Sequence, residues 1–113
     1  RAVERVRAGN RAGLEVEVEI NTLEELEEVL PLQVDRILLD NMDLEVMREA
    51  VSRIRAVGEG RALAEASGNM TLDRVRAVAE MGVDLISVGA LTHSAPQADL
   101  SLRVIRRWNQ ASD

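Results

Sequence analysis

The chain has 113 residues, enough for one domain with a hydrophobic core, and 46% of them are hydrophobic. Its net charge of -6 argues against a nucleic-acid partner, because phosphate backbones bind basic surfaces. The sequence contains no cysteine, which excludes disulfides and thiolate metal sites, and no apolar run long enough to span a bilayer. Since a signal-peptide pattern is also absent, we expect a cytoplasmic protein that does not bind membranes.

The N-terminal part of the chain predicts a helix, a strand and a second helix. Residues 2–8 have a helical pattern. Residues 14–20 alternate between apolar residues and glutamates, which is typical of a strand with one polar face. Thr22 and Glu25 form a capping box that begins the second helix, and Pro31 ends it.

The rest of the chain repeats the strand and helix pattern. Three short apolar stretches predict further strands, over residues 37–39, 62–64 and 85–88. The helix between the first two is capped by Asn41 or Asp43, and Thr71 caps the next one. We expect these two helices to bury one face each, made of Met47, Ala50, Val51, Ile54 and Val57 in the first and of Leu72, Val75, Val78 and Ala79 in the second.

This order of elements predicts an α/β fold. Strands and helices joined by short connections require parallel strands with right-handed crossovers. Four such units make about half of a TIM-like barrel, so we expect parallel βα repeats that form half of an incomplete barrel. An open four-stranded sheet is the alternative. Residues 99–104 alternate with period two and predict a C-terminal strand, although Pro96 could begin a helix there instead.

Polar residues follow each predicted strand, and in a parallel sheet these positions share the carboxyl-end rim where ligands bind. Glu19 and Asp40 come first, and two carboxylates on neighbouring strands suit Mg²⁺ or the hydroxyls of a ribose. Glu19 could instead belong to the wet face of an edge strand, and Asp40 could be a helix N-cap.

Two glycine-bearing turns come next on the same rim. Ser67, Gly68 and Asn69 precede a helix, and this arrangement suits a phosphate because backbone N–H groups at a helix start point toward an anion. Gly89 and Ala90 repeat it one unit later. The glycines could also serve only to make tight turns. His93, the only histidine, is placed to donate to a bound phosphate, although a lone histidine is more often a surface or packing residue.

Together these residues resemble a known family. The chain is similar to the C-terminal half of quinolinate phosphoribosyltransferase, also called nicotinate-nucleotide pyrophosphorylase (carboxylating), over nearly all of residues 10–105. The similarity lies in four segments: Glu17-Val18-Glu19-Ile20, Ile37-Leu38-Leu39-Asp40-Asn41-Met42, Glu65-Ala66-Ser67-Gly68-Asn69-Met70, and Gly82-Val83-Asp84-Leu85-Ile86-Ser87-Val88-Gly89-Ala90-Leu91-Thr92-His93-Ser94.

The resemblance implies an enzyme that joins quinolinate to phosphoribosyl pyrophosphate with Mg²⁺. The products would be nicotinate mononucleotide for NAD synthesis, pyrophosphate and CO₂. Glu19 and Asp40 would face the ribose hydroxyls and the magnesium, and Glu19 would stabilise the cationic sugar. The 5-phosphate would lie among Ser67, Gly68, Asn69, Gly89, Ala90 and His93, with Asn69 standing where many members have a second glycine.

The resemblance also implies what this chain does not contain. Residues 1–113 would be a partial α/β-barrel domain, without the family's N-terminal sandwich domain, the first half of the barrel or the cluster of Arg, Lys and His that holds quinolinate. Because the family's active site is shared between subunits, a homodimer or a higher oligomer is implied. Two alternatives stay open: a catalytically inactive half-barrel that at most binds phosphate, and a paralogous transferase with another acceptor, such as the one associated with molybdenum transport.

Overall fold

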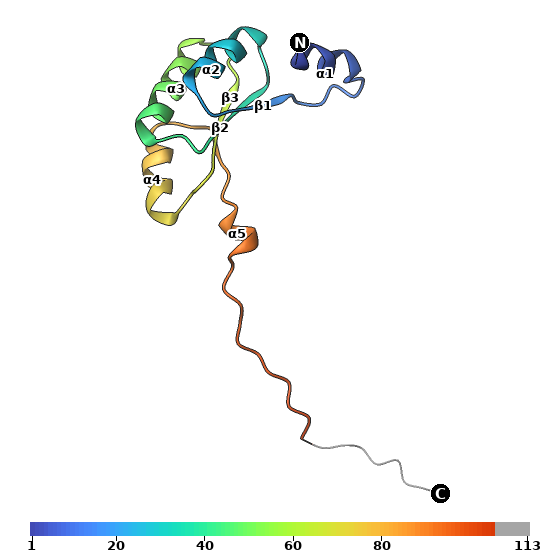
Figure 1. Ribbon diagram of the computed structural model, residues 1–113, viewed down its shortest axis with the longest axis vertical. Helices are drawn as coiled ribbons and strands as arrows, with labels where there is room; N and C mark the ends of the chain where they lie inside the picture. The colour runs from blue at the N-terminus through green and yellow to red at the C-terminus, as the bar shows by residue number, and fades with distance from the viewer. Residues whose placement is uncertain (106–113) are drawn as a thin grey trace, which may run out of the picture.

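The computed structural model describes residues 1–105, and within them four parallel strands form one sheet (Figure 1). The strands lie in chain order and are β1 (Glu17–Ile20), β2 (Arg36–Asp40), β3 (Leu63–Ser67) and β4 (Leu85–Ile86). Each strand pairs with the next one in parallel register. The predicted α/β class and the parallel βα repeats are therefore confirmed.

Helices cover one side of this sheet. The helical segments of residues 1–105 are α1 (Ala2–Gly9), α2 (Leu23–Val29), the 3₁₀ turn η1 (Leu30–Leu32), α3 (Leu44–Ala56), α4 (Leu72–Glu80) and α5 (Ala90–His93). Figure 1 shows α2, α3 and α4 along one side of the sheet, α1 beyond β1, and α5 at the start of the extended C-terminal segment. The capping box at Thr22 and Glu25 is formed as predicted, and Pro31 lies in the 3₁₀ turn that ends α2.

The two faces of the sheet have different chemistry because alternate side chains of a strand point to opposite faces. The helix-covered face is apolar, with Val18 and Ile86 half-buried on the outer strands. Its other strand residues are at most 2% exposed: Ile20, Ile37, Leu39, Ala64 and Ala66. On the opposite face, Glu17 is in register with Arg36, and Glu19 is in register with Leu38 and so with Glu65. We call this second side, which carries Glu17, Glu19, Arg36, Leu38, Asp40, Glu65 and Ser67, the open face.

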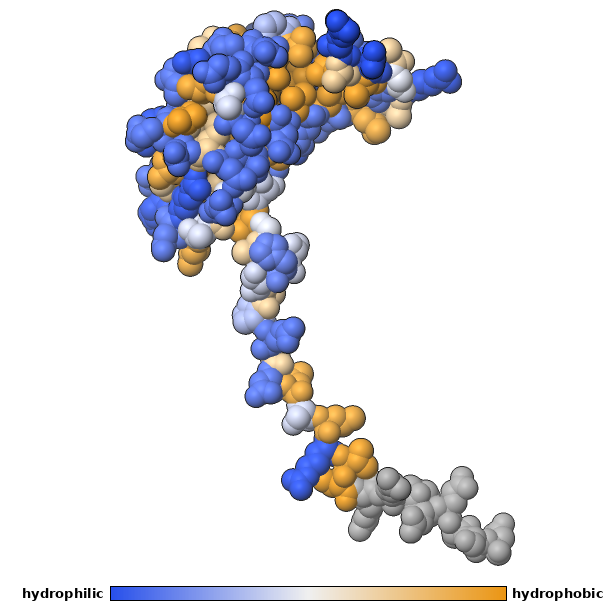
Figure 2. Space-filling model, in the orientation of Figure 1, coloured by the Kyte–Doolittle hydropathy of each residue, from blue (hydrophilic) through white to orange (hydrophobic). Residues whose placement is uncertain are grey.

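The predicted strand over residues 99–104 is wrong. Residues 95–105 have no regular secondary structure, and none of the other described segments pairs with them. Leu100 and Leu102 are 88% and 96% exposed, and Figure 2 shows this segment standing clear of the folded part. An alternating pattern forms a strand only where a neighbouring backbone offers hydrogen bonds, and no described segment of this chain offers them here.

Some positions expected on buried helix faces are exposed. Leu72 is 90% exposed because it lies in the first turn of α4, beyond the end of β3, and Met70 is buried just before the helix instead. Ala79 is exposed as well. Val57 follows the last residue of α3 and is 52% exposed. Within residues 1–105, no helix combines the length and the apolar character needed to cross a bilayer.

Candidate functional site

One pocket brings together the two predicted glycine turns. It has a volume of about 280 Å³ and is lined by Ser67, Gly68, Asn69, Met70, Ser87, Gly89, Ala90 and His93. All six residues predicted to surround a phosphate are among them. The first four follow or end β3, and the others follow β4, so the pocket lies at the carboxyl end of these two neighbouring strands. We call it the rim pocket.

Backbone conformation fixes the first wall of the rim pocket. Gly68 has a φ of +78°, and a Cβ atom at this position would lie 2.7 Å from the backbone nitrogen of Asn41. Only glycine fits both conditions. The next residue, Asn69, also has a positive φ, of 47°, which asparagine tolerates better than most residues. The Nδ2 of Asn69 donates to Oδ1 of Asn41 at 2.9 Å, so the turn after β3 is tied to the turn after β2.

Asp40 lies beside this wall. It ends β2 and is in register with Ser67 on β3. Its Oδ2 accepts a hydrogen bond from Nδ2 of Asn41 at 2.7 Å, and its backbone carbonyl accepts from Nδ2 of Asn21 at 3.1 Å. The N-cap of α3 is Asp43, so Asp40 does not have the alternative role of helix cap. Three of the four turns on the rim therefore contact each other around this carboxylate.

Glu19 shares the open face with Asp40 but lies outside the rim pocket. It is in register with Leu38, two residues before Asp40, and alternation therefore places both carboxylates on one face. Its exposed side chain lines a separate hollow together with residues of α1. β1 is an edge strand of the sheet, as the alternative interpretation of its glutamates requires. The same glutamates also form part of the open face.

A polar network surrounds the buried Glu65 on the open face, and Glu65 is not among the predicted site residues. Glu65 accepts from Nη1 of Arg36 at 3.1 Å on Oε2, and its Oε1 accepts from the hydroxyl of Ser87. Arg36 also bonds Oε2 of Glu15 at 3.0 Å, and its pKa is raised mainly by the hydrogen bond to Glu65. Only the strand register places Arg36 and Glu65 on the same face as the glutamates of β1, so the sequence alone does not bring them together.

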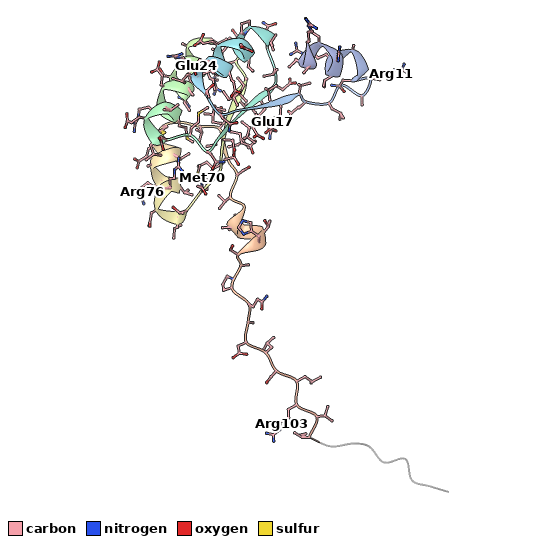
Figure 3. All side chains as sticks on the ribbon, in the orientation of Figure 1. Arg11, Glu17, Glu24, Met70, Arg76 and Arg103 are labelled. Carbon is pink, nitrogen blue, oxygen red and sulfur yellow. The ribbon has the colours of Figure 1, made fainter. Side chains whose placement is uncertain are left out.

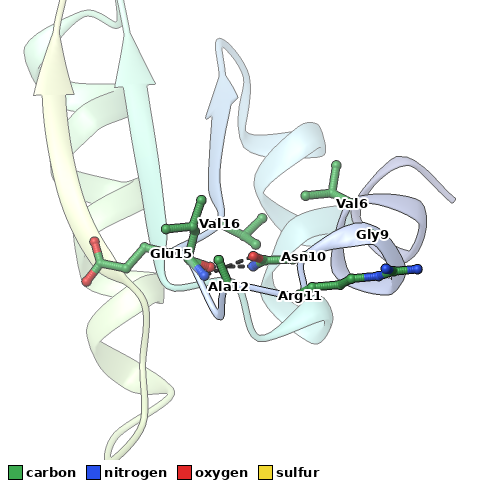
Figure 4. Close-up of a pocket in the computed structure, with 8 residues that line it drawn as sticks. Val6, Gly9, Asn10, Arg11, Ala12, Glu15 and Val16 are labelled. Carbon is green, nitrogen blue, oxygen red and sulfur yellow. Dashed lines mark hydrogen bonds between the residues drawn. The ribbon is translucent and has the colours of Figure 1, made fainter.

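A larger hollow lies far from the predicted residues. Figure 4 shows it between α1 and the start of β1, with a volume of about 470 Å³. Asn10 closes the loop there, because its side chain donates to the carbonyl of Leu14 at 2.6 Å and accepts from the same residue's N–H at 2.9 Å. This hollow lies at the amino end of β1, and Figure 3 shows Arg11 on its outer side, away from Met70 at the rim. It holds none of the predicted site residues.

The residues predicted to hold Mg²⁺ are two carboxylates, Glu19 and Asp40. Residues 1–105 contain no group of three or more His, Asp or Glu side chains that could hold a metal ion. Mg²⁺ bound next to a phosphate substrate commonly takes only one or two carboxylates and completes its shell with phosphate oxygens and water. Glu19 and Asp40 would supply the two carboxylates that such a Mg²⁺ takes, and they do not make a metal site of protein side chains alone.

This chain is similar to several known proteins. A probable nicotinate-nucleotide pyrophosphorylase (carboxylating) from Synechocystis is 41% identical over 106 residues, which cover 94% of this chain and 36% of that protein. The chloroplastic nicotinate-nucleotide pyrophosphorylase (carboxylating) of rice is 39% identical over 117 residues, covering 90% of this chain and 30% of the relative. The structure of nicotinate-nucleotide pyrophosphorylase from Francisella tularensis has a TM-score of 0.69 and 36% identity, covering 80% of this chain and 31% of that one.

These relatives are much longer than the part they share with this chain, which spans about a third of their length. Residues 1–103 match the family model described as quinolinate phosphoribosyl transferase, C-terminal domain. The chain therefore belongs to the quinolinate phosphoribosyltransferase family and matches its C-terminal domain.

Proposed function

We propose that this chain supplies the phosphoribosyl-binding part of a quinolinate phosphoribosyltransferase. The reaction would join quinolinate to phosphoribosyl pyrophosphate and release pyrophosphate and CO₂, giving nicotinate mononucleotide for NAD biosynthesis. The observation that supports this most is the rim pocket, in which the turns after β3 and β4 meet beside the carboxylate of Asp40. Family membership supports the identity of the reaction.

In the proposed complex, the 5-phosphate lies in the rim pocket. Glycine at positions 68 and 89 lets the backbone approach the anion closely, and backbone N–H groups donate to it. His93 adds a further donor from α5, since its Nε2 lies 3.1 Å from where a Cβ of residue 89 would be. The ribose then extends toward Asp40, which would bind its hydroxyls.

The carboxylates of the open face have a role in the proposed bond cleavage. As pyrophosphate leaves, positive charge develops on the sugar carbon, and a nearby carboxylate stabilises that charge. We assign this role to Glu19, with Asp40 holding the hydroxyls. Glu19 and Asp40 would also hold Mg²⁺, which when bound supplies positive charge to the pyrophosphate leaving group.

The acceptor must be held by residues outside the part described here. The open face carries Glu17 and Glu19, and its arginine, Arg36, is already paired with the carboxylates of Glu15 and Glu65. Such a face repels a dicarboxylate like quinolinate. We propose that the missing cations come from a preceding sandwich domain and first barrel half, or from a second subunit in a homodimer or higher oligomer.

The cytoplasmic location stays a prediction, because the rice relative is named chloroplastic.

Binding of phosphoribosyl pyrophosphate to this chain in the presence of Mg²⁺ tests the proposal. We expect measurable binding by calorimetry without turnover. Gly89→Ala places a methyl group against His93 on the pocket wall without any backbone strain, since residue 89 has a φ of -58°. Loss of phosphate contacts should weaken binding by about tenfold or more. Ala95→Gly, outside the pocket, is the control, and unchanged affinity in a folded Gly89→Ala variant would contradict the proposal.

A further inference from the structure

Among the described residues, Glu65 is the one charged residue that is buried, at 7% exposed. It lies in the middle of β3 on the open face, between Arg36 of β2 and Ser87 after β4. The proposed reaction gives it no role, because its carboxylate does not line the rim pocket. Burying a charge costs free energy unless the charge is paired and hydrogen-bonded, and both conditions are met here.

The hydrogen bonds of Glu65 have a defined direction. Glu65 forms an ion pair with Arg36 at 3.1 Å, and a carboxylate in an ion pair only accepts hydrogen bonds. Ser87 must therefore donate its single hydroxyl proton to Oε1 of Glu65. A serine hydroxyl has one proton and two acceptor lone pairs, so Oγ of Ser87 can offer only lone pairs to anything else.

Ser87 is also one of the residues that line the rim pocket. A ligand oxygen without a hydrogen atom, such as a phosphate oxygen, gains nothing from a wall atom that can only accept. A ligand hydroxyl can donate to it. The hydroxyl of Ser87 therefore distinguishes the two ends of a sugar phosphate.

We propose that Ser87 accepts a hydrogen bond from a hydroxyl of the sugar, and that Glu65 is a positioning residue that holds the serine proton away from the ligand. This inference rests on the proposed function, because it assumes that a sugar phosphate occupies the rim pocket. The phosphate then lies against the backbone N–H groups near Gly68 and Gly89. The rim pocket thus selects phosphate esters of polyols over simple phosphates, with Ser87 as a specificity-determining residue.

A comparison of two ligands tests the direction of this hydrogen bond. Ribose 5-phosphate carries both groups, and methyl phosphate carries the phosphate ester without a sugar hydroxyl. Ser87→Ala should weaken ribose 5-phosphate binding to this chain by about two- to tenfold, the range for one hydrogen bond, and leave methyl phosphate unchanged. Ser87→Thr keeps the hydroxyl and should restore the preference. Ser52→Ala, exposed on α3, is the control.

Glu65→Gln tests the positioning role separately. Its amide can donate to Ser87, which frees the serine proton to point into the pocket. The ratio of ribose 5-phosphate affinity to methyl phosphate affinity should fall, whereas a purely structural role would lower both equally. If this variant does not fold, Ser87→Ala and Ser87→Thr decide the question alone.

The outcomes separate this inference from the proposed function. If the unsubstituted chain binds neither ligand, the phosphate pocket itself is refuted, and this inference with it. If both ligands bind and Ser87→Ala weakens both equally, or weakens methyl phosphate alone, only the inference about Ser87 is overturned.

Discussion

Asp84 and Arg61 form a two-point ion pair at the amino end of the sheet. Nη1 of Arg61 lies 2.7 Å from Oδ2 of Asp84, and Nη2 lies 2.8 Å from Oδ1. The same Oδ2 accepts the backbone N–H of Ala64 at 2.8 Å. Asp84, which directly precedes β4, thus holds the first residues of β3 in place. The hydrogen bond from Arg61 is the main reason that the pKa of Asp84 falls to about 2.

Asp84 should make the stability of the chain depend on pH in acid. Its folded pKa lies below its ordinary value of 3.8, so the stabilisation is complete above the unfolded pKa and is lost as the pH falls toward about 2. With allowance for partial solvent screening, we expect about 1–2 kcal/mol of unfolding free energy to be lost. Urea titrations at several pH values would measure this. Asp84→Asn should remove most of the dependence, whereas Asp99→Asn should leave it intact.

Gly68→Ala should destabilise the chain through two separate effects. The left-handed backbone at this position, with a φ of +78°, strains any residue with a Cβ, and that Cβ would also meet Asn41 at 2.7 Å. We expect the free energy of unfolding, measured with urea, to fall by about 2–4 kcal/mol.

Gly58→Ala separates the two effects. Gly58 has a similar φ of +83°, but a Cβ there would meet nothing within 4 Å. Its cost should stay near the strain alone, about 1 kcal/mol. Equal losses in the two variants would argue against the close approach of the turns after β2 and β3.

Glu19→Gln should lower turnover rather than substrate binding. In a complete quinolinate phosphoribosyltransferase subunit that carries this chain, we expect kcat to fall by about 10²-fold because a charge that stabilises the sugar cation is removed. The KM for phosphoribosyl pyrophosphate should change less than kcat, because Asp40 still holds the hydroxyls. Glu24→Gln, on the exposed side of α2 (Figure 3), is the matched control. Near-normal turnover of the Glu19 variant would show that another group carries this role.

Removing the side chain of Arg36 should lower the free energy of unfolding by more than its partial exposure suggests. Arg36→Met leaves the side chain of Glu65, 10% exposed, without its cation. An uncompensated buried charge typically costs about 3–5 kcal/mol, and the carboxylate's bond to Ser87 offsets a part of that. The double variant Arg36→Met with Glu65→Leu should recover most of the stability. Chemical unfolding of both single variants and the double variant measures the coupling, and additive losses would contradict it.

The sequence predicted the rim better than the open face, for a physical reason. Gly68 and Gly89 could be placed together because parallel βα units always bring successive carboxyl ends to one edge. The pairing of Glu65 with Arg36 and Ser87 depends on the register of three strands, and local sequence does not determine register. The same limit explains the wrong prediction of a strand over residues 99–104, because an alternating pattern does not show which strand would pair with it. Leu72 was misplaced because helical periodicity does not say where the sheet beneath ends.

The order of the strands along the chain has a consequence for how the domain assembles and opens. Within residues 1–105, every strand pairs only with its sequence neighbours, so no strand pairing there requires a segment distant along the chain. The two inner strands have hydrogen-bonded partners on both sides, and the outer two have one each. Amide hydrogen exchange should therefore be slowest in β2 and β3 and faster in β1 and β4, with fraying that begins at either margin and leaves the centre intact.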